Sequence, residues 1–312
     1  MSVYTVISEE DLGRFIQRFD IGSLLSYRGI DEGIENTNYF VDTDWGDYVL
    51  TLFEWLEADQ LPYFINLMCH VADCGLPCPH PIADRQGLTL HELKGKPAAL
   101  ITRLPGRTIK APSVAQCQQV GDILAKMHLV MRDFDGHSEN IRDIGWFKMQ
   151  SDNIQSKLSK DDSALLNDEI KHQSKQLSDA LPAGTIHADL FKDNALFEGE
   201  RLSGVIDFYY ACHAKLLYDV AVTVNDWCRS ADQHLSHPHY EALINAYHLR
   251  RPFEPTERDE WQNILRRAAL RFWLSRLRDK LFPKDGAITH IKDPNVFKNI
   301  LLLCREEDYE LC

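Results

Sequence analysis

The segment at 186–211 constrains the fold of this chain more than any other part of the sequence. It reads IHADLFKDNALFEGERLSGVIDFYYA. Asp189 and Asn194 lie on a stretch with little helical or strand periodicity, and two short apolar runs separated by a turn with Gly199 follow. Two such runs predict a β-hairpin. The hairpin would return Asp207, which follows its second strand, to the side of Asn194.

These three side chains are the groups that phosphoryl transfer needs. Mg²⁺ prefers oxygen donors in octahedral geometry and keeps waters that phosphate oxygens can replace, so Asn194 and Asp207 are candidate metal ligands. Asp189 is the candidate base that accepts the proton of an attacking hydroxyl. A simpler interpretation is that these side chains only cap turns. It does not explain why three groups compatible with Mg²⁺ occur in this order.

The spacing of these groups resembles that of a known family. H-x-D-x-x-x-x-N at 187–194, followed by I-D-F at 206–208, is similar to the catalytic loop and metal-binding segment of protein-kinase-like phosphotransferases. The closer resemblance is to the small-molecule branch with the aminoglycoside phosphotransferases, choline kinases and homoserine kinases. It implies ATP and Mg²⁺ as cofactors, Asp189 as the catalytic base, and Asn194 and Asp207 as metal ligands.

The same resemblance implies a bilobal, protein-kinase-like fold of the α+β class. Residues 1–103 would form an N-terminal nucleotide-binding lobe, with a five-stranded antiparallel sheet plus helices. Residues 104–312 would form a larger, mainly helical lobe with the catalytic loop and the substrate site. The hinge is expected at about 102–106, where a Pro-Gly pair breaks the last strand. Kinase hinges offer backbone groups to adenine, so Arg103 and Leu104 are candidate ATP contacts.

The nucleotide site departs from the kinase pattern on the third predicted strand. That strand carries Thr51 where related enzymes place Lys or Arg, and the helix after it lacks the acidic partner. Asn36, Asn38 and the Thr51 hydroxyl are therefore candidate phosphate donors. The loop with Gly33 would offer backbone N–H groups to the phosphates, although an ordinary hairpin turn is the competing interpretation.

A helix predicted from about Leu217 to Cys228 carries Asp219 and Asp226 on one stripe. Acids on a largely buried helix are costly unless they are paired. In the small-molecule kinases an acid like Asp219 braces the catalytic loop, and we expect His187 to support the loop as well. Asp226 is the candidate to bind a substrate ammonium, and an internal salt bridge is the alternative.

The long helix predicted at about 256–282 supplies candidate cations. Arg276 falls on its apolar side, where a buried guanidinium needs a planar anion. That anion is either an acid of this chain or a substrate carboxylate. Arg271, placed on the polar face of the helix, is the second candidate for a carboxylate. Tyr209, two residues after the predicted metal acid, is a candidate substrate contact.

Composition excludes several classes of function. The chain has 312 residues and a net charge of −13, which argues against nucleic acid or an anionic membrane as a partner. No apolar run approaches the ~20 residues of a membrane span, and the N-terminus lacks the regions of a signal peptide. We therefore expect a cytoplasmic protein. Cys69, Cys74 and Cys78 lie near two histidines and indicate either small buried thiols or, as the alternative, a zinc site.

The segments at 48–53, 222–228 and 268–277 closely resemble the homoserine kinases of the aminoglycoside-phosphotransferase-like type. The resemblance implies transfer of the ATP γ-phosphoryl group to the hydroxyl of L-homoserine, making O-phospho-L-homoserine for threonine biosynthesis. The partners would then be L-homoserine and ATP, with a monomer or a dimer as the assembly. An amino-acid substrate needs an acid for its ammonium and an arginine for its carboxylate, which Asp226 and Arg276 (or Arg271) could supply.

Two other functions stay open from the sequence. One is another small-molecule kinase on the same scaffold, acting on choline, hydroxylysine or an aminoglycoside. The other is a nucleotide-binding pseudokinase that regulates a partner. The missing Lys–Glu pair favours the pseudokinase, and the intact Asp189, Asn194 and Asp207 oppose it.

Overall fold

The computed structural model describes residues 4–30, 36–175, 177–283 and 292–312. The chain divides into two compact units, and the boundary follows Pro105. The N-terminal unit contains the residues up to Pro105 together with Gly204–Ile206, and the C-terminal unit contains most of the remainder.

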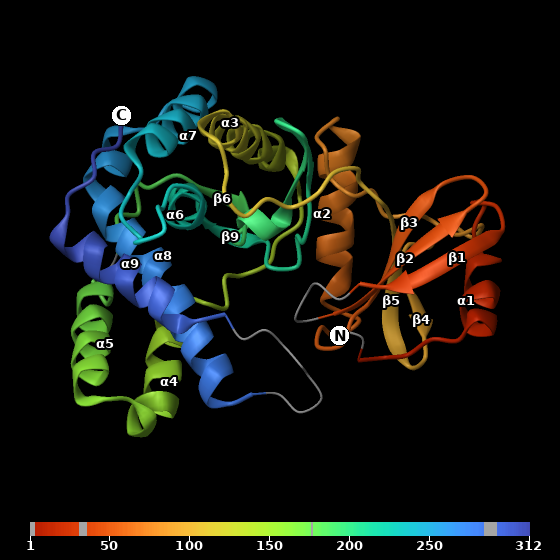
Figure 1. The fold of residues 1–312 in the computed structure, drawn as a ribbon, viewed down its shortest axis with the longest axis horizontal. Helices are drawn as coiled ribbons and strands as arrows, with labels where there is room; N and C mark the ends of the chain where they lie inside the picture. The colour runs from red at the N-terminus through yellow and green to blue at the C-terminus, as the bar shows by residue number, and fades with distance from the viewer. Residues whose placement is uncertain (1–3, 31–35, 176, 284–291) are drawn as a thin grey trace. The chain divides into compact units, whose positions relative to one another are not determined.

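The N-terminal unit is built on one antiparallel sheet. Its strand order is β1-β2-β3-β5-β4 (Figure 1), which confirms the expected five-stranded sheet. The elements in chain order are α1 (Glu9–Ile16), β1 (Leu24–Gly29), β2 (Thr37–Thr43), β3 (Asp47–Leu52), α2 (Leu61–Asp73), β4 (His91–Leu93) and β5 (Lys96–Thr102).

One face of this sheet packs on α1. Side chains of β2 alternate between buried and half-buried positions, as expected for a strand with one covered face. The Ser8 side chain accepts a hydrogen bond from the Asp11 amide and begins the helix. The resulting core joins α1 to β2, β3 and β5 through fully buried side chains, among them Leu12, Val41, Leu50 and Leu100.

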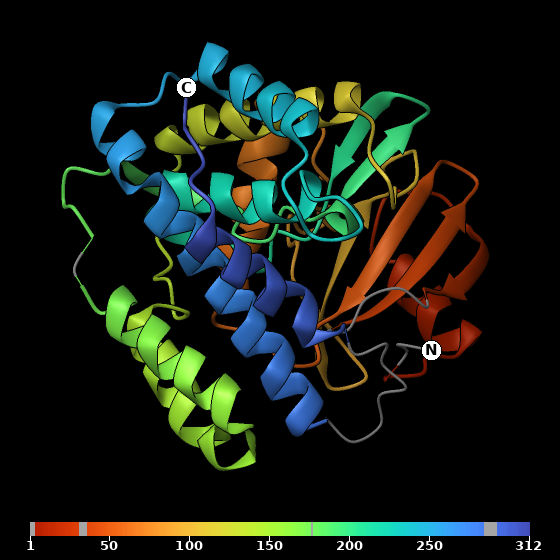
Figure 2. The ribbon, with the colours of Figure 1, turned by 60° about the vertical axis from the view of Figure 1, so that its left-hand side comes forward.

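The C-terminal unit is mainly helical. Its helices are α3 (Val114–Val130), α4 (Ile144–Ile154), α5 (Lys160–Gln173), α6 (Leu216–Trp227), α7 (His237–Arg250), α8 (Pro255–Leu281) and α9 (Pro294–Glu306). The helices α8 and α9 lie side by side in both views, and α4 and α5 pack together beside α8 (Figure 1, Figure 2). The helix α6 packs on α8, so α8 is covered on more than one side.

Two small ribbons complete the C-terminal part of the fold. The strands β7 (Ala195–Glu198) and β8 (Arg201–Val205) form the hairpin that the sequence predicted. The strands β6 (Ala183–Ile186) and β9 (Cys212–Lys215) pair antiparallel and were not predicted. Each has only four residues, too few to show a periodic pattern.

The helix α4 begins at Ile144 because the Asp143 side chain accepts hydrogen bonds from the Gly145 and Trp146 amides. The helix α7 was not predicted as a separate element. In the described ranges no helix is long and apolar enough to cross a membrane.

Candidate active site

The β6–β9 ribbon brings the two halves of the candidate site together. Ile186 pairs with Cys212 at the end of this ladder. His187 follows Ile186 directly, and Ala211 precedes Cys212. The pairing therefore sets the loop with Asp189 beside the segment with Asp207. The sequence had predicted only the β7–β8 hairpin as the element that brings these two segments together.

Asp219 anchors the candidate catalytic loop through its backbone amides. This carboxylate is fully buried and accepts hydrogen bonds of 2.8 Å from the backbone amides of both His187 and Ala188. Its Oδ2 lies 3.0 Å from Nε2 of His128 on α3, whose Nδ1 lies 2.7 Å from the Tyr247 hydroxyl. Burial by itself raises the pKa of Asp219, but the hydrogen bond and charge of His128 and the His187 amide hold it below its ordinary value.

Asp226 holds the same loop two helical turns further along α6. Its Oδ2 accepts a 2.8 Å hydrogen bond from the Lys192 amide, and its Oδ1 lies 3.8 Å from the Lys192 ammonium. Burial raises the pKa of Asp226, and Lys192 opposes the rise. Between the loop residues bound by Asp219 and by Asp226, the Leu190 carbonyl accepts a 3.0 Å hydrogen bond from the Trp227 indole. Asp226 thus has the internal partner that was the alternative to a substrate ammonium, although its side chain remains 17% exposed.

Asp189 is surrounded by charged side chains of both signs. Burial raises the pKa of Asp189 to about 8; the positive charge of Arg271 opposes this, and the negative charges of Asp207 and Asp193 add to it. The Asn194 side-chain amide donates to the Asp189 carbonyl at 2.8 Å and to its Oδ2 at 3.1 Å. A carboxylate with a raised pKa accepts a proton more readily at neutral pH than an ordinary aspartate.

The donor set around Asp189 fits a divalent cation. The Asn194 NH₂ group is turned toward Asp189, which leaves its Oδ1 as the atom able to bind a cation. Asp207 is close enough for its charge to act on Asp189, and amide and carboxylate oxygens are the donors that Mg²⁺ takes. No group of three or more His, Cys, Asp or Glu suited to a metal occurs in the described part of the chain, including the Cys69–Cys78 region.

Strained backbone marks both ends of this arrangement. Ala188 and Asp207 each have φ of 65°, a left-handed conformation that is uncommon for residues other than glycine. Such strain persists where the surrounding structure enforces it, and it clusters at functional sites. Asp219 supplies that enforcement for Ala188 through the 2.8 Å hydrogen bond to its amide.

Neither candidate arginine of α8 has the environment that helical periodicity predicted. Arg271, expected on the polar face, is only 5% exposed, and its Nη1 lies 3.9 Å from Asp189 Oδ1. Arg276, expected to be buried, is half-buried; it donates to the Asp293 carbonyl at 3.2 Å and lies 4.4 Å from the Phe297 ring centroid. The prediction was wrong on burial because α8 packs against neighbours on several sides.

The predicted phosphate donors of the N-terminal unit form one cross-strand pair. Asn38 on β2 lies opposite Thr51 on β3, and the Thr51 hydroxyl donates to Asn38 Oδ1 at 2.7 Å. Thr51 is 2% exposed and its hydroxyl hydrogen is already used, so it supports Asn38 instead of offering a donor itself. Asn36 is half-buried, and Gly33 lies outside the described residues.

The predicted hinge contacts are divided between side chain and backbone. The Arg103 amide donates to the Asp47 carbonyl at 3.1 Å. Its guanidinium lies 3.4 Å from Asp42 Oδ1 and 4.1 Å from the Phe40 ring centroid. Arg103 is therefore tied into the sheet, and the predicted adenine contact is left to Leu104, which is half-buried.

Tyr209, the candidate substrate contact, is half-buried. Two cations near the site, Arg142 and Lys192, were not predicted from the sequence. The Arg142 guanidinium lies 4.1 Å from the ring centroid of Tyr210, the residue after Tyr209. The only available signal for these two cations was their nearness in the chain to other site residues, and isolated Lys and Arg residues usually lie on a solvated face.

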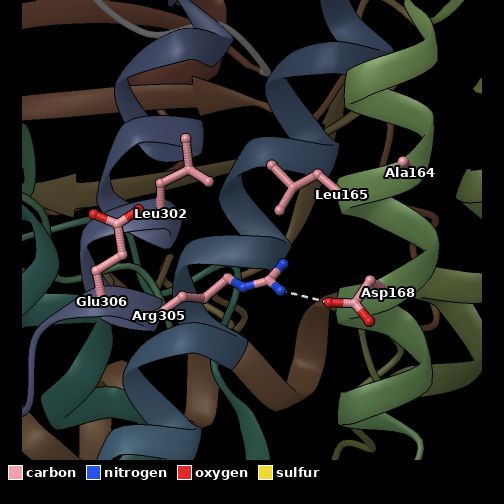
Figure 3. A pocket seen from close by; sticks show the side chains of 6 residues that line it. All are labelled: Ala164, Leu165, Asp168, Leu302, Arg305 and Glu306. Carbon is pink, nitrogen blue, oxygen red and sulfur yellow. Dashed lines mark hydrogen bonds and ion pairs between the residues drawn. The ribbon is translucent and has the colours of Figure 1, made fainter.

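A separate hollow of about 530 Å³ lies between α5 and α9 (Figure 3). Arg305 of α9 spans it and pairs with Asp168 of α5 at 2.5 Å. No residue of the candidate active site lines this hollow. It carries the internal Arg305–Asp168 ion pair.

The fold of the two units and the groups around Asp189 define a protein-kinase-like phosphotransferase. A model of the phosphotransferase enzyme family matches residues 26–261. The chain belongs to this family.

Within this family, the chain is similar over nearly its whole length to proteins named homoserine kinase. The chain is 46% identical to the homoserine kinase of Methylobacillus flagellatus over 301 residues, which cover 96% of this chain and 94% of the relative. It is 43% identical to the homoserine kinase of Neisseria meningitidis serogroup B over 302 residues, covering 97% and 99% of the two chains. The similarity thus spans both units.

Solved structures agree on the fold. A spectinomycin phosphotransferase in complex with ADP and spectinomycin matches with a TM-score of 0.71 at 13% identity, covering 96% of this chain and 98% of that chain. An amicoumacin kinase in complex with AMP-PNP and Ca²⁺ matches with a TM-score of 0.70 at 10% identity, covering 96% and 92%. At these identities the likeness concerns architecture only.

Proposed function

We propose that this chain is a homoserine kinase that transfers the γ-phosphoryl group of ATP to the hydroxyl of L-homoserine and releases ADP. The observation that carries the proposal is the grouping of Asp189, Asn194 and Asp207 in a chain that resembles proteins named homoserine kinase over nearly its whole length. The product would be O-phospho-L-homoserine.

In this proposal Asp189 positions the acceptor hydroxyl and takes its proton as the oxygen attacks the γ-phosphorus. Its raised pKa of about 8 suits a base that works near neutral pH. Asn194 fixes the Asp189 carboxylate through its NH₂ group, and Asp219 fixes the turn before it. Most of the rate enhancement then comes from positioning and neutralisation of charge.

The residues that would hold a divalent cation, which we take to be Mg²⁺, are Asn194 through Oδ1 and Asp207 through its carboxylate. When bound, such a cation neutralises phosphate charge and orients the phosphates for in-line displacement. Asn38 and Leu104 are the proposed contacts of this chain with ATP. Asn36, Gly33 and Arg103 stay predictions, as do Asp226, Arg276 and Tyr209 for the substrate.

The test is ADP release by the purified protein with L-homoserine, choline, hydroxylysine or kanamycin as acceptor, with and without Mg²⁺. We expect turnover with L-homoserine that depends on Mg²⁺ and exceeds that with each other acceptor by at least about 10²-fold in kcat/KM. Choline and kanamycin lack the carboxylate, and a site built to bind a polar substrate group rejects molecules without it; hydroxylysine carries its hydroxyl further from the carboxylate and is longer than homoserine. A clear preference for any of the other three acceptors would replace this proposal. ATP binding without turnover of any acceptor would favour a pseudokinase.

A further inference from the structure

Arg271 is an almost fully buried guanidinium beside Asp189. It is 5% exposed, and its Nη1 lies 3.9 Å from Asp189 Oδ1, beyond hydrogen-bonding distance. Among the described residues the guanidinium therefore has an ion pair with Asp189 but no hydrogen bond to it. Aromatic rings surround it instead, with Cζ 3.8 Å from the Phe272 centroid and 5.3 Å from the Tyr210 centroid. A buried guanidinium whose neighbouring acid is beyond hydrogen-bonding distance suits an anion that a ligand brings.

Arg142 places a second guanidinium at the same ring. It comes from the residue before the N-cap of α4, and its Cζ lies 4.1 Å from the Tyr210 centroid. Both cations also act on one buried neighbour: burial raises the pKa of Cys212 to about 12, with Asp219 adding to the rise and Arg271 and Arg142 opposing it. Two guanidiniums from separate elements thus converge at Tyr210.

Tyr210 places these two guanidiniums close to the candidate site residues Asp189 and Asp207. It lies three residues after Asp207, in a turn closed by a 2.9 Å hydrogen bond from the Ala211 amide to the Phe208 carbonyl. The Arg271 guanidinium also lies beside the carboxylate of Asp189. If Arg271 binds an anionic group of the acceptor, a hydroxyl only a few bonds away in the same acceptor molecule could therefore reach Asp189.

We propose that Arg271 and Arg142, gathered at Tyr210, bind the carboxylate of the acceptor amino acid and make this carboxylate the group by which the enzyme selects its substrate. The proposal rests on the function proposed above and deepens it. Guanidiniums match the two oxygens of a carboxylate in a plane. A short hydroxy amino acid bridges Arg271 and Asp189, whereas an amino alcohol without the carboxylate makes no such contact with Arg271.

The test compares Arg142→Met with the wild type on two acceptors, L-homoserine and 3-aminopropan-1-ol, which is homoserine without its carboxylate. We expect kcat/KM for L-homoserine to fall by about 10²-fold, the scale of losing one charged contact to a substrate group. For 3-aminopropan-1-ol we expect a change of less than about threefold, and no change in the KM for ATP. Arg142→Lys should recover part of the loss because it restores the charge without the planar fork.

Arg278→Met is the matched control, since Arg278 lies on α8 and pairs with Asp279 at 2.8 Å; it should alter neither acceptor. Thermal melting of Arg142→Met beside the wild type separates a folding defect from a binding defect. Equal losses with both acceptors, or a loss expressed only in the KM for ATP, would overturn the carboxylate site while leaving the proposed function in place. A wild-type enzyme that does not phosphorylate L-homoserine would overturn the proposed function and the carboxylate site together.

Discussion

The carboxylate of Asp219 on α6 accepts a 2.8 Å hydrogen bond from the backbone amide of Ala188, a residue whose φ of 65° lies in the left-handed region. The same carboxylate accepts from the His187 amide at 2.8 Å. A buried acid on one element thereby enforces the strained turn that presents Asp189 from another. The conformation of this candidate catalytic loop depends on the hydrogen bonding, because an alanine does not by itself favour the left-handed conformation.

Replacement of Asp219 should show this dependence in stability. Asp219→Asn keeps the shape but has one acceptor oxygen in place of two, so it leaves a buried donor of the loop or of His128 unsatisfied. We expect the free energy of unfolding in urea to fall by about 3–5 kcal/mol. The control is Asp168→Asn, which breaks a partly exposed ion pair with Arg305 and should lower stability by less than about 1 kcal/mol.

The pH dependence of this effect has a definite sign. The folded-state pKa of Asp219 lies below its ordinary value of 3.8, so its ionised form stabilises the fold above that pH and the contribution is lost as the pH falls through the folded-state pKa. The difference in stability between wild type and Asp219→Asn should therefore shrink on acidification below about pH 4. A constant difference from pH 6 to pH 3 would contradict the assignment.

Asp189 should show the opposite linkage together with a loss of activity. Its pKa is raised from 3.8 to about 8, so burial of this acid destabilises the fold increasingly as the pH rises between these values. Asp189→Asn should lower kcat by about 10²–10⁴-fold. Its melting temperature relative to the wild type should increase from pH 5 to pH 8, because the amide does not ionise. Near-normal turnover would remove Asp189 from the role of base.

Arg271 should control the ionisation of Asp189. Its positive charge lowers the pKa of Asp189 against the effect of burial. Arg271→Met should therefore move the acidic limb of the pH profile of kcat/KM to higher pH. Measuring the profile with 3-aminopropan-1-ol separates this effect from loss of carboxylate binding. Arg278→Met is the control, and an unshifted limb in Arg271→Met would show that the 3.9 Å ion pair does not act on the base.

Asn194 should determine the affinity for the divalent cation. Chelation with EDTA should abolish ADP release with L-homoserine, and Mg²⁺ should restore it. Asn194→Ala should raise the Mg²⁺ concentration for half-maximal rate by about tenfold or more, since an oxygen ligand is lost from a small site that needs near-octahedral geometry. Asn153→Ala, at an exposed position of α4, serves as the control. Equal Mg²⁺ dependence in the two variants would exclude Asn194 as a ligand.

Two glycines offer a test of helix packing in opposite directions. Gly121 on α3 lies so close to α7 that an added Cβ would overlap the Leu243 carbonyl, and backbone does not move aside as a side chain does. Gly121→Ala should lower the free energy of unfolding by about 1–3 kcal/mol. Gly13 on α1 has no atom within 4 Å of such a Cβ, so Gly13→Ala should raise stability by about 0.5–1 kcal/mol. Thermal and urea unfolding of both variants measure the difference.

Local sequence patterns were sufficient for several of the elements and for the choice of the candidate site residues. The β7–β8 hairpin, the strands of the N-terminal sheet and the long helix α8 follow from periodicity and turn residues, which act over a few neighbouring positions. Asp189, Asn194 and Asp207 could be selected as a group because their spacing follows from one loop and one hairpin. Asp219 could be assigned to the loop only through the resemblance to small-molecule kinases; burial by itself indicated that the acid needs a partner but not which one.

The environments of single side chains were decided by the tertiary structure. Periodicity placed Arg271 on a polar face, but α8 is covered by α6, α9 and α4, so solvent does not define one outer side of the helix. The Lys192 amide beside Asp226 and the Arg142 guanidinium at Tyr210 come from distant parts of the chain, as does the short β6–β9 pairing. The sequence by itself determined which groups are present and in which elements. Which of them meet depends on long-range packing, because contacts between distant residues leave no periodic trace in the chain.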